Sequence, residues 1–246
     1  MGSLEEGVAA VHLIEVHPMF QLNINGERTQ PLTVLCLGAH SDDIEIGCGG
    51  TVLRLVQECP NIAVHWVVFS SEGPRKREAE ESARRFLLHA RRKTVEIKKF
   101  RGSFFPFRGE AIKECFEQLK KRFVPDIIFT HYRQDLHQDH RIISDFTWNT
   151  FRDNFILEYE IPKYDGDLGA PNCFVHLDYA VCQAKVLNLL ECFKTQANKQ
   201  WFTEDTFYSL LRLRGIEANA PEKYAEAFYG RKLVLGGGNL SESVTM

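Results

Sequence analysis

Short apolar runs rich in β-branched residues alternate, in the first part of the chain, with longer segments that carry charge at helical spacing. The runs cover residues 33–39, 62–70, 93–100 and 125–132. The segments between them, at 49–59, 76–90 and 110–123, place apolar residues three or four positions apart, which predicts amphipathic helices. Alternating strands and helices predict a Rossmann-like open α/β sheet, mostly parallel, with right-handed crossovers and helices on both faces.

The runs at 33–39 and 126–132 are almost continuously apolar, which is typical of central strands covered on both faces. The second half is less regular, with helices predicted near 179–195 and 203–214. A chain of 246 residues with 44% hydrophobic content can form one sizeable core, so we expect a single domain over residues 1–246. Within it we expect an N-terminal extension over 1–31 and a mobile, glycine-rich tail over 236–246.

Composition narrows the class of partner. A net charge of -3 without a long basic block gives no footprint for nucleic acid or an anionic membrane surface. No leader pattern and no run of about 18 apolar residues occurs, so we expect a cytoplasmic protein without a membrane span. Seven cysteines without CxxC spacing predict free, mostly buried thiols. A small molecule or a glycan is the expected partner, and homo-oligomerisation is left open.

A first polar cluster lies in LGAHSDDIEIGCGGT, residues 37–51, directly after the first predicted strand. His40, Asp42 and Asp43 would stand at the carboxyl end of that strand, where open parallel sheets bind ligands. The alternative is that the two aspartates only begin the next helix and interact with its dipole. The following glycines do not fit the GxGxxG dinucleotide pattern.

A second cluster lies in THYRQDLHQDH, residues 130–140, after another predicted central strand. It contains four candidate groups: Asp135, His137, Asp139 and His140. If the strands beginning near Thr33 and Asp126 are neighbours, the two clusters converge at one edge of the sheet, with His40 and His140 within about 10 Å. A divalent ion would neutralise carboxylates that otherwise repel one another, and nitrogen and oxygen ligands without thiolate favour a catalytic zinc site.

The two motifs resemble the signatures of the PIG-L/LmbE-like de-N-acetylase family, commonly written AHPDD, followed by a glycine-rich turn, and HPDH. The resemblance covers roughly residues 33–145, includes RKREAEESA after the second strand, and is fainter at YAEAF near residue 226. Two positions depart from the pattern, because Ser41 and Gln138 stand where the family usually has proline. Neither position carries a ligand, so the departures concern the rigidity of the two loops.

The resemblance implies a zinc-dependent N-deacetylase with three metal ligands, His40, Asp43 and His140. It makes Asp42 the general base on water, because adjacent side chains diverge and only Asp43 can share the ion. His137 would protonate the leaving amine or stabilise the oxyanion, with Asp139 orienting it. Another divalent metal remains an alternative to zinc.

The expected reaction is removal of an N-acetyl group from an amino sugar such as N-acetylglucosamine, free, nucleotide-linked or in a glycan precursor. The alternatives are a metal-dependent amidase for another small amide and a non-catalytic glycan or nucleotide binding protein of the same fold. Arg77 and Glu226 are candidate substrate contacts. Arg75 and Arg77 could equally lie on a solvated helix face, and Tyr224 and Glu226 on an amphipathic edge.

Overall fold

The computed structural model describes residues 21–22 and 30–234. Most of the expected extension over 1–31 and the whole tail over 236–246 lie outside the described residues, and the single domain over 1–246 stays a prediction. Within the described part of the chain, no helix is long and apolar enough to cross a membrane.

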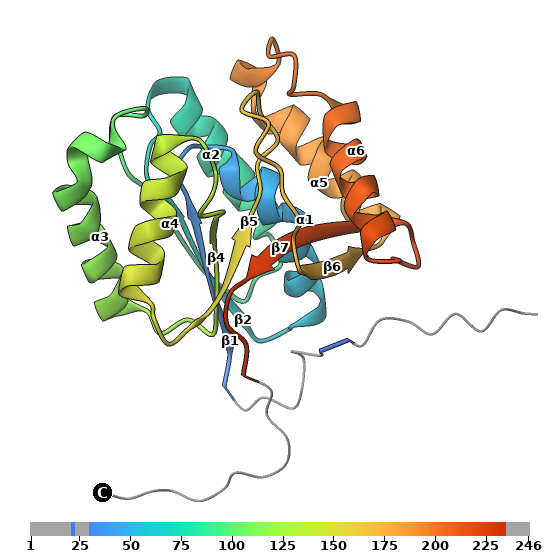
Figure 1. The fold of residues 1–246 in the computed structure, drawn as a ribbon, viewed down its shortest axis with the longest axis horizontal. Helices are drawn as coiled ribbons and strands as arrows, with labels where there is room; N and C mark the ends of the chain where they lie inside the picture. Colours follow the sequence, from blue (N-terminus) through green and yellow to red (C-terminus); the bar gives the residue numbers. More distant parts are fainter. Residues whose placement is uncertain (1–20, 23–29, 235–246) are drawn as a thin grey trace, which may run out of the picture.

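Seven strands form one sheet in the order β3-β2-β1-β4-β5-β7-β6 (Figure 1). The strands are β1 (Leu32–Gly38), β2 (Ile62–Val68), β3 (Arg92–Ile97), β4 (Ile127–His131), β5 (Phe155–Tyr159), β6 (Cys173–Leu177) and β7 (Tyr224–Gly230). The first five are parallel to one another, whereas β7 is antiparallel to both β5 and β6. The mostly parallel α/β sheet expected from the alternating pattern is confirmed.

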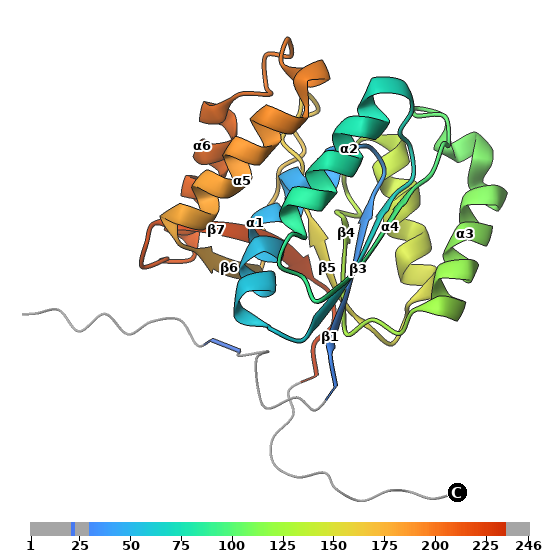
Figure 2. The same ribbon diagram turned by 180° about the vertical axis from the view of Figure 1, so that it is seen from behind.

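Six α-helices and two 3-10 turns connect the described strands. They are α1 (Asp43–Glu58), α2 (Gly73–Phe86), η1 (Phe105–Arg108), α3 (Gly109–Arg122), α4 (Gln138–Thr150), α5 (Tyr179–Cys192), η2 (Lys194–Gln196) and α6 (Glu204–Glu217). Local sequence explains several starts: Pro74 occupies the first turn of α2, and the side chains of Asp178 and Thr203 cap α5 and α6. Figures 1 and 2 show α3 and α4 on one face of the sheet, with α1, α2 and α5 on the other.

The two faces of β1 bury two separate cores. Val34 and Cys36 pack with α1, α2 and α5, whereas Leu35 and Leu37 pack with α3 and α4. This alternation explains the continuously apolar sequence, since a strand covered on both sides needs apolar residues at every position. All seven cysteines are free, and four of them are buried, as their spacing predicted.

The order in which strands are added to the sheet changes sides between β1 and β4, which are neighbours and parallel. From β1 the chain adds β2 and β3 on one side, then returns to place β4 on the other side, with Val34 opposite Ile127. This confirms the expected adjacency of the strands that precede the two motifs. The loops after β1 and β4 therefore leave the carboxyl edge of the sheet in opposite directions, and this is the usual ligand position in such sheets.

The C-terminal strand β7, which contains YAEAF, does not form an edge. It lies between β5 and β6, with Glu158 opposite Tyr229 and Val175 opposite Glu226. Five of its seven residues are buried. The interpretation of Glu226 as part of an amphipathic edge is therefore wrong, because strands flank it on both sides.

Candidate metal site and catalytic cluster

The two motifs meet at the carboxyl ends of β1 and β4. His40 and Asp42 lie in the loop that leaves β1, and Asp43 begins α1. His137 precedes the first residue of α4, and its Nδ1 accepts the backbone N–H of Asp139 at 3.2 Å, which caps the helix. Both helices therefore start at the same edge of the sheet.

Three donor atoms form a nearly equilateral triangle. Nδ1 of His40 lies 3.2 Å from Nε2 of His140, and Oδ2 of Asp43 lies 3.4 Å from the first and 3.6 Å from the second. Ligands about 2.0 to 2.1 Å from a tetrahedral ion are separated by about 3.3 Å. The expectation that His40 and His140 lie within about 10 Å is confirmed. The three donor atoms are spaced like three of the four ligands of a tetrahedral ion.

A carboxylate holds the second nitrogen of each imidazole. Nε2 of His40 lies 3.0 Å from Asp139, and Nδ1 of His140 lies 2.9 Å from Asp135. Carboxylates commonly orient metal-binding histidines in this way, which leaves the opposite nitrogen facing the ion. Asp139 was expected to orient His137, but its carboxylate contacts His40 and only its backbone amide contacts His137.

Asp139 is itself fixed by the loop after β3. Its carboxylate accepts backbone N–H groups from Ser103 at 2.6 Å and from Phe105 at 3.1 Å. Gly102 lies directly against His40, since a Cβ at this glycine would stand 3.7 Å from the imidazole Cδ2. The β3–α3 connection therefore forms a wall of the site, which neither motif indicated.

A fourth histidine, His131, lies behind the triangle. Its Nε2 is 3.2 Å from Oδ2 of Asp43 and accepts the N–H of Ala39 at 2.9 Å, and its ring stacks on His140 with 3.9 Å between centroids. Two sets of donors are close enough to hold an ion, His40/His137/His140 and Asp43/His131/His140. His131 was not among the predicted ligands, although it lies within residues 130–140 and ends β4.

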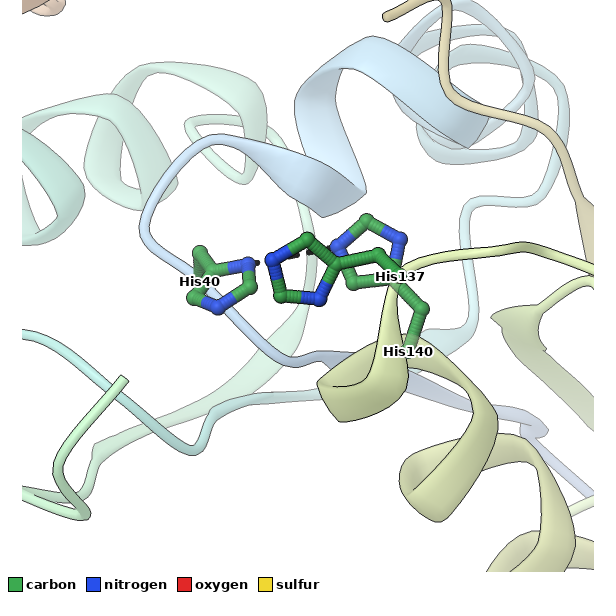
Figure 3. Close-up of side chains that lie close together, drawn as sticks. All are labelled: His40, His137 and His140. Atoms are coloured by element: carbon green, nitrogen blue, oxygen red, sulfur yellow. Dashed lines mark hydrogen bonds between the residues drawn. The ribbon is translucent and has the colours of Figure 1, made fainter. Parts of the chain in front are cut away.

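His137 lies on the open side of the triangle. Figure 3 shows its ring in front of the hydrogen bond between His40, from the β1–α1 loop, and His140, from α4. The centroid of His137 is 4.9 Å from that of His40 and 4.5 Å from that of His140. Because Nδ1 accepts a backbone N–H, the remaining nitrogen, Nε2, is the one that can face a substrate.

The carboxylate of Asp42 is bound by Arg75, which approaches from α2. Asp42 is 5% exposed, its Oδ1 accepts a hydrogen bond from Arg75 at 2.6 Å, and its side chain makes no helix-capping bond. Asp42 occupies the N-cap position of α1, so it begins the helix without capping it through its side chain. Arg75, which follows β2 at the start of α2, is the arginine that reaches the site.

Both departures from the family motifs make hydrogen bonds to neighbouring loops. Ser41 donates to Ser71 at 2.8 Å and accepts from Arg75 at 3.3 Å. Gln138 donates to the carbonyl of Ser103 at 2.5 Å. Side-chain bonds therefore restrain the two loops at the positions where proline would restrain the backbone.

The pKa values in the cluster show that the carboxylates around His40 stabilise a positive charge there. Burial lowers the pKa of His40, but the carboxylates of Asp43 and Asp139 outweigh it and raise the pKa to about 10. Burial and the nearby His131 lower the pKa of His140 to about 3. Burial raises the pKa of Asp43, yet three surrounding imidazoles hold it well below its usual range. The proton on His40 thus occupies the region where the three donors meet.

The predicted substrate contacts lie apart from this cluster. Arg77 is exposed on α2, whose buried residues begin at Ala79. Glu226 is 4% exposed, bonds to Lys185 at 2.5 Å and accepts the backbone N–H groups of Gly50 and Thr51. These contacts account fully for the burial of Glu226, and a substrate contact by either residue stays a prediction.

The fold and the site together define an α/β protein with a His–Asp–His cluster that could hold a cation, at the point where strands are added on opposite sides of β1. Residues 35–151 match the PIG-L family, described as GlcNAc-PI de-N-acetylase. The matched residues include both motifs, and the family is the one that the two motifs resemble.

Solved structures share this fold at low sequence identity. N,N'-diacetylchitobiose deacetylase from Pyrococcus horikoshii has a TM-score of 0.64 and 20% identity, covering 81% of this chain and 84% of its own. The zinc-inhibited form of teicoplanin deacetylase Orf2 has a TM-score of 0.62 and 13% identity, covering 80% and 97%. GalB, the 4-carboxy-2-hydroxymuconate hydratase from Pseudomonas putida, has a TM-score of 0.67 and 15% identity, covering 84% and 99%. At these identities the likeness shows the fold alone.

Proposed function

We propose that this protein is a metal-dependent hydrolase that removes the acetyl group from an N-acetylated amino sugar. The match of residues 35–151 to the PIG-L family supports the reaction class. The observation that carries the proposal is the triangle of His40, Asp43 and His140, next to which Asp42 stands buried and bound to Arg75. A binding protein would not need a separate carboxylate next to a complete ligand set.

The donor set fits a divalent ion such as zinc. His40, Asp43 and His140 would hold it through two nitrogens and one oxygen, at mutual separations of 3.2 to 3.6 Å. When bound, such an ion polarises an amide carbonyl and lowers the pKa of water towards neutrality. The carboxylates of Asp135 and Asp139 keep both imidazoles aimed at the same point.

Asp42 is the proposed general base. Burial raises the pKa of its carboxyl above the usual value, while the guanidinium of Arg75 opposes the rise and fixes one oxygen. In the proposed reaction Asp42 takes a proton from water as the water oxygen bonds to the acetyl carbon. It then returns that proton to the sugar nitrogen as the C–N bond breaks, giving acetate and a free amine.

His137 is the proposed donor to the developing oxyanion. Its Nδ1 accepts the amide N–H of Asp139, so a neutral ring carries its proton on Nε2. Burial and the positive charge of His40 lower the pKa of His137, which favours this neutral form. Of the two roles considered for His137, oxyanion stabilisation therefore has the better support.

The first test is release of acetate from a panel of N-acetylated sugars and sugar nucleotides by purified protein, with and without a chelator. We expect release from at least one amino sugar, lost with chelator and restored by zinc or another divalent ion. Release from non-sugar amides alone would instead identify an amidase. Hydrolysis that chelation leaves unchanged would contradict metal dependence.

The second part of the test is metal analysis of His40→Ala beside a matched surface control, His89→Ala. His89 is an exposed histidine that makes no contact with the cluster. We expect the control to retain stoichiometric metal and His40→Ala to lose most of it, because one of three ligands is removed. Equal retention by both variants would remove His40 from the site.

A further inference from the structure

The loop beside the catalytic cluster has an unusual composition. Residues 98–108, KKFRGSFFPFR, contain four cations, four phenylalanines and no carboxylate, in a chain whose net charge is -3. The segment connects β3 to α3 and includes the 3-10 turn η1. The mechanism proposed above uses only two of its backbone amides, those of Ser103 and Phe105.

This loop is anchored at the site and turned outwards at its tip. Phe105 is fully buried in the core, and its amide binds Asp139. Phe107, two residues further on, is 77% exposed, and Phe104 is 37% exposed. Phe105 therefore fixes the loop beside Asp139, while Phe104 and Phe107 are exposed to solvent.

Exposed cations surround the two outward phenylalanines. Lys99, Arg101 and Arg108 are all exposed, and none forms an ion pair with another described residue, whereas Lys98 pairs with Glu96 at 2.7 Å. The guanidinium of Arg101 lies 3.7 Å from the centre of the Phe104 ring. We call Lys99, Arg101, Phe104, Phe107 and Arg108 the rim patch.

Apolar exposure continues on the next loop around the site. Leu136 is 58% exposed, and Gln138, two residues later, bonds to Ser103 of the loop that carries the rim patch. Leu136 also precedes His137, the proposed oxyanion donor. The exposed apolar side chains therefore border the entrance to the catalytic cluster rather than a remote face.

We propose that the rim patch docks the protein onto an anionic membrane surface, with the His40/His137/His140 cluster on the side that faces the headgroups. Unpaired lysine and arginine side chains are attracted to anionic lipid, and exposed aromatic rings insert at the interface. The patch spans one loop of a net acidic protein, which is too short a basic surface for a nucleic acid strand. This proposal does not depend on the deacetylase reaction, and it revises the expectation drawn from net charge alone.

The test uses the full chain and vesicles of phosphatidylcholine with and without phosphatidylglycerol. We expect co-sedimentation only with the anionic vesicles, decreasing as salt is added. Lys99→Gln and Arg108→Gln should each lower the partition coefficient about fivefold, since one cation near the surface is removed. Phe107→Ser should weaken binding to anionic vesicles at every salt concentration.

Matched controls lie at the far end of α3 and beyond it. Lys120→Gln removes the same charge from an exposed site, and Val124→Ser removes an apolar side chain that is 88% exposed. Both should bind vesicles like the wild type. Equal losses in the controls and the rim patch variants would overturn the proposal.

A tryptophan at the tip gives a readout specific to insertion. Phe107→Trp should show a blue-shifted emission with anionic vesicles and no comparable shift with heparin, which is a soluble polyanion. Failure of the wild type to sediment with anionic vesicles at low salt, or a shift with heparin alone, would overturn the proposal. Hydrolysis of a soluble substrate, measured on Phe107→Ser, tests the proposed reaction separately.

Discussion

Two clusters of buried charge in this protein are built in opposite ways. Around the triangle at the ends of β1 and β4, carboxylates face imidazoles whose nitrogens converge on one point. Near β7, Lys185 bonds to Glu226 at 2.5 Å and Arg214 bonds to Glu160 at 2.6 and 2.8 Å. These pairs, named here the β7 ion pairs, match each carboxylate with a permanent cation.

The β7 ion pairs also satisfy backbone groups. Lys185 donates to the carbonyl of Ile46, and Glu226 accepts the N–H groups of Gly50 and Thr51, all in α1. The internal cavity bordered by both pairs measures about 20 Å³, which is room for about one water molecule. Complete pairing and lack of space indicate a structural role there.

The comparison shows that burial of charged residues does not by itself mark a functional site. Both clusters are buried, and both join segments far apart in the chain. The triangle differs from the β7 ion pairs in two ways. Its donor atoms lie as close together as the ligands of one ion, and no lysine or arginine among the described residues contacts them. Three experiments test this distinction.

The largest effect should come from substituting Asp42, the proposed base, and Asp43, the proposed ligand beside it, one at a time. Asp42→Asn should lower kcat by roughly 100- to 10,000-fold at near-normal metal occupancy, because a positioned base is lost. Asp43→Asn should also lose activity, but through weaker metal binding. Added metal should partly restore Asp43→Asn only. Turnover of Asp42→Asn near the wild-type rate, or its rescue by metal, would end the assignment.

A smaller effect, on stability, should follow from breaking a β7 ion pair. Lys185→Met leaves Glu226 buried without its cation and should lower the free energy of unfolding by about 3 to 5 kcal/mol. Urea denaturation measures this, with Lys185→Met/Glu226→Leu as the matched double variant, which should recover part of the loss. Metal affinity of the folded protein should stay unchanged. A drop in affinity as large as that of Asp43→Asn would contradict the structural role.

The smallest effect should come from the carboxylate behind a ligand. Asp135→Asn keeps the size of the side chain but weakens its hold on Nδ1 of His140, so metal affinity should fall about 10- to 100-fold. Competition with a chelating dye measures the affinity directly. Asp165→Asn, on the exposed β5–β6 connection, is the control and should bind metal normally. Unchanged affinity in Asp135→Asn would remove this carboxylate from the support of the site.

Much of this arrangement could be predicted from the sequence. Apolar periodicity defined the strands, and parallel strands bring their carboxyl ends to one edge, so His40 and His140 were expected to meet. The partners of these residues were harder to predict. Asp139 holds His40 across 99 positions of sequence, and Arg75 reaches Asp42 from another helix. Such pairings depend on how loops pack, which local patterns do not encode.

Two features of the structure differ from what the net charge and the local sequence pattern predict. YAEAF resembles an amphipathic edge, but two antiparallel partners bury it, and nothing in the local sequence indicates the second one. The overall charge of -3 concealed a loop with four cations in eleven residues. An average over the chain carries no information about where like charges collect.

The triangle also has a consequence for folding. His40 and His140 are 100 positions apart, so an ion held by both would close a long loop that the unfolded chain leaves open. Because the donors converge only in the native state, the free energy of metal binding would add to the free energy of folding. Metal supply in the cell would then govern how long the folded chain survives proteolysis, in addition to whether it is active.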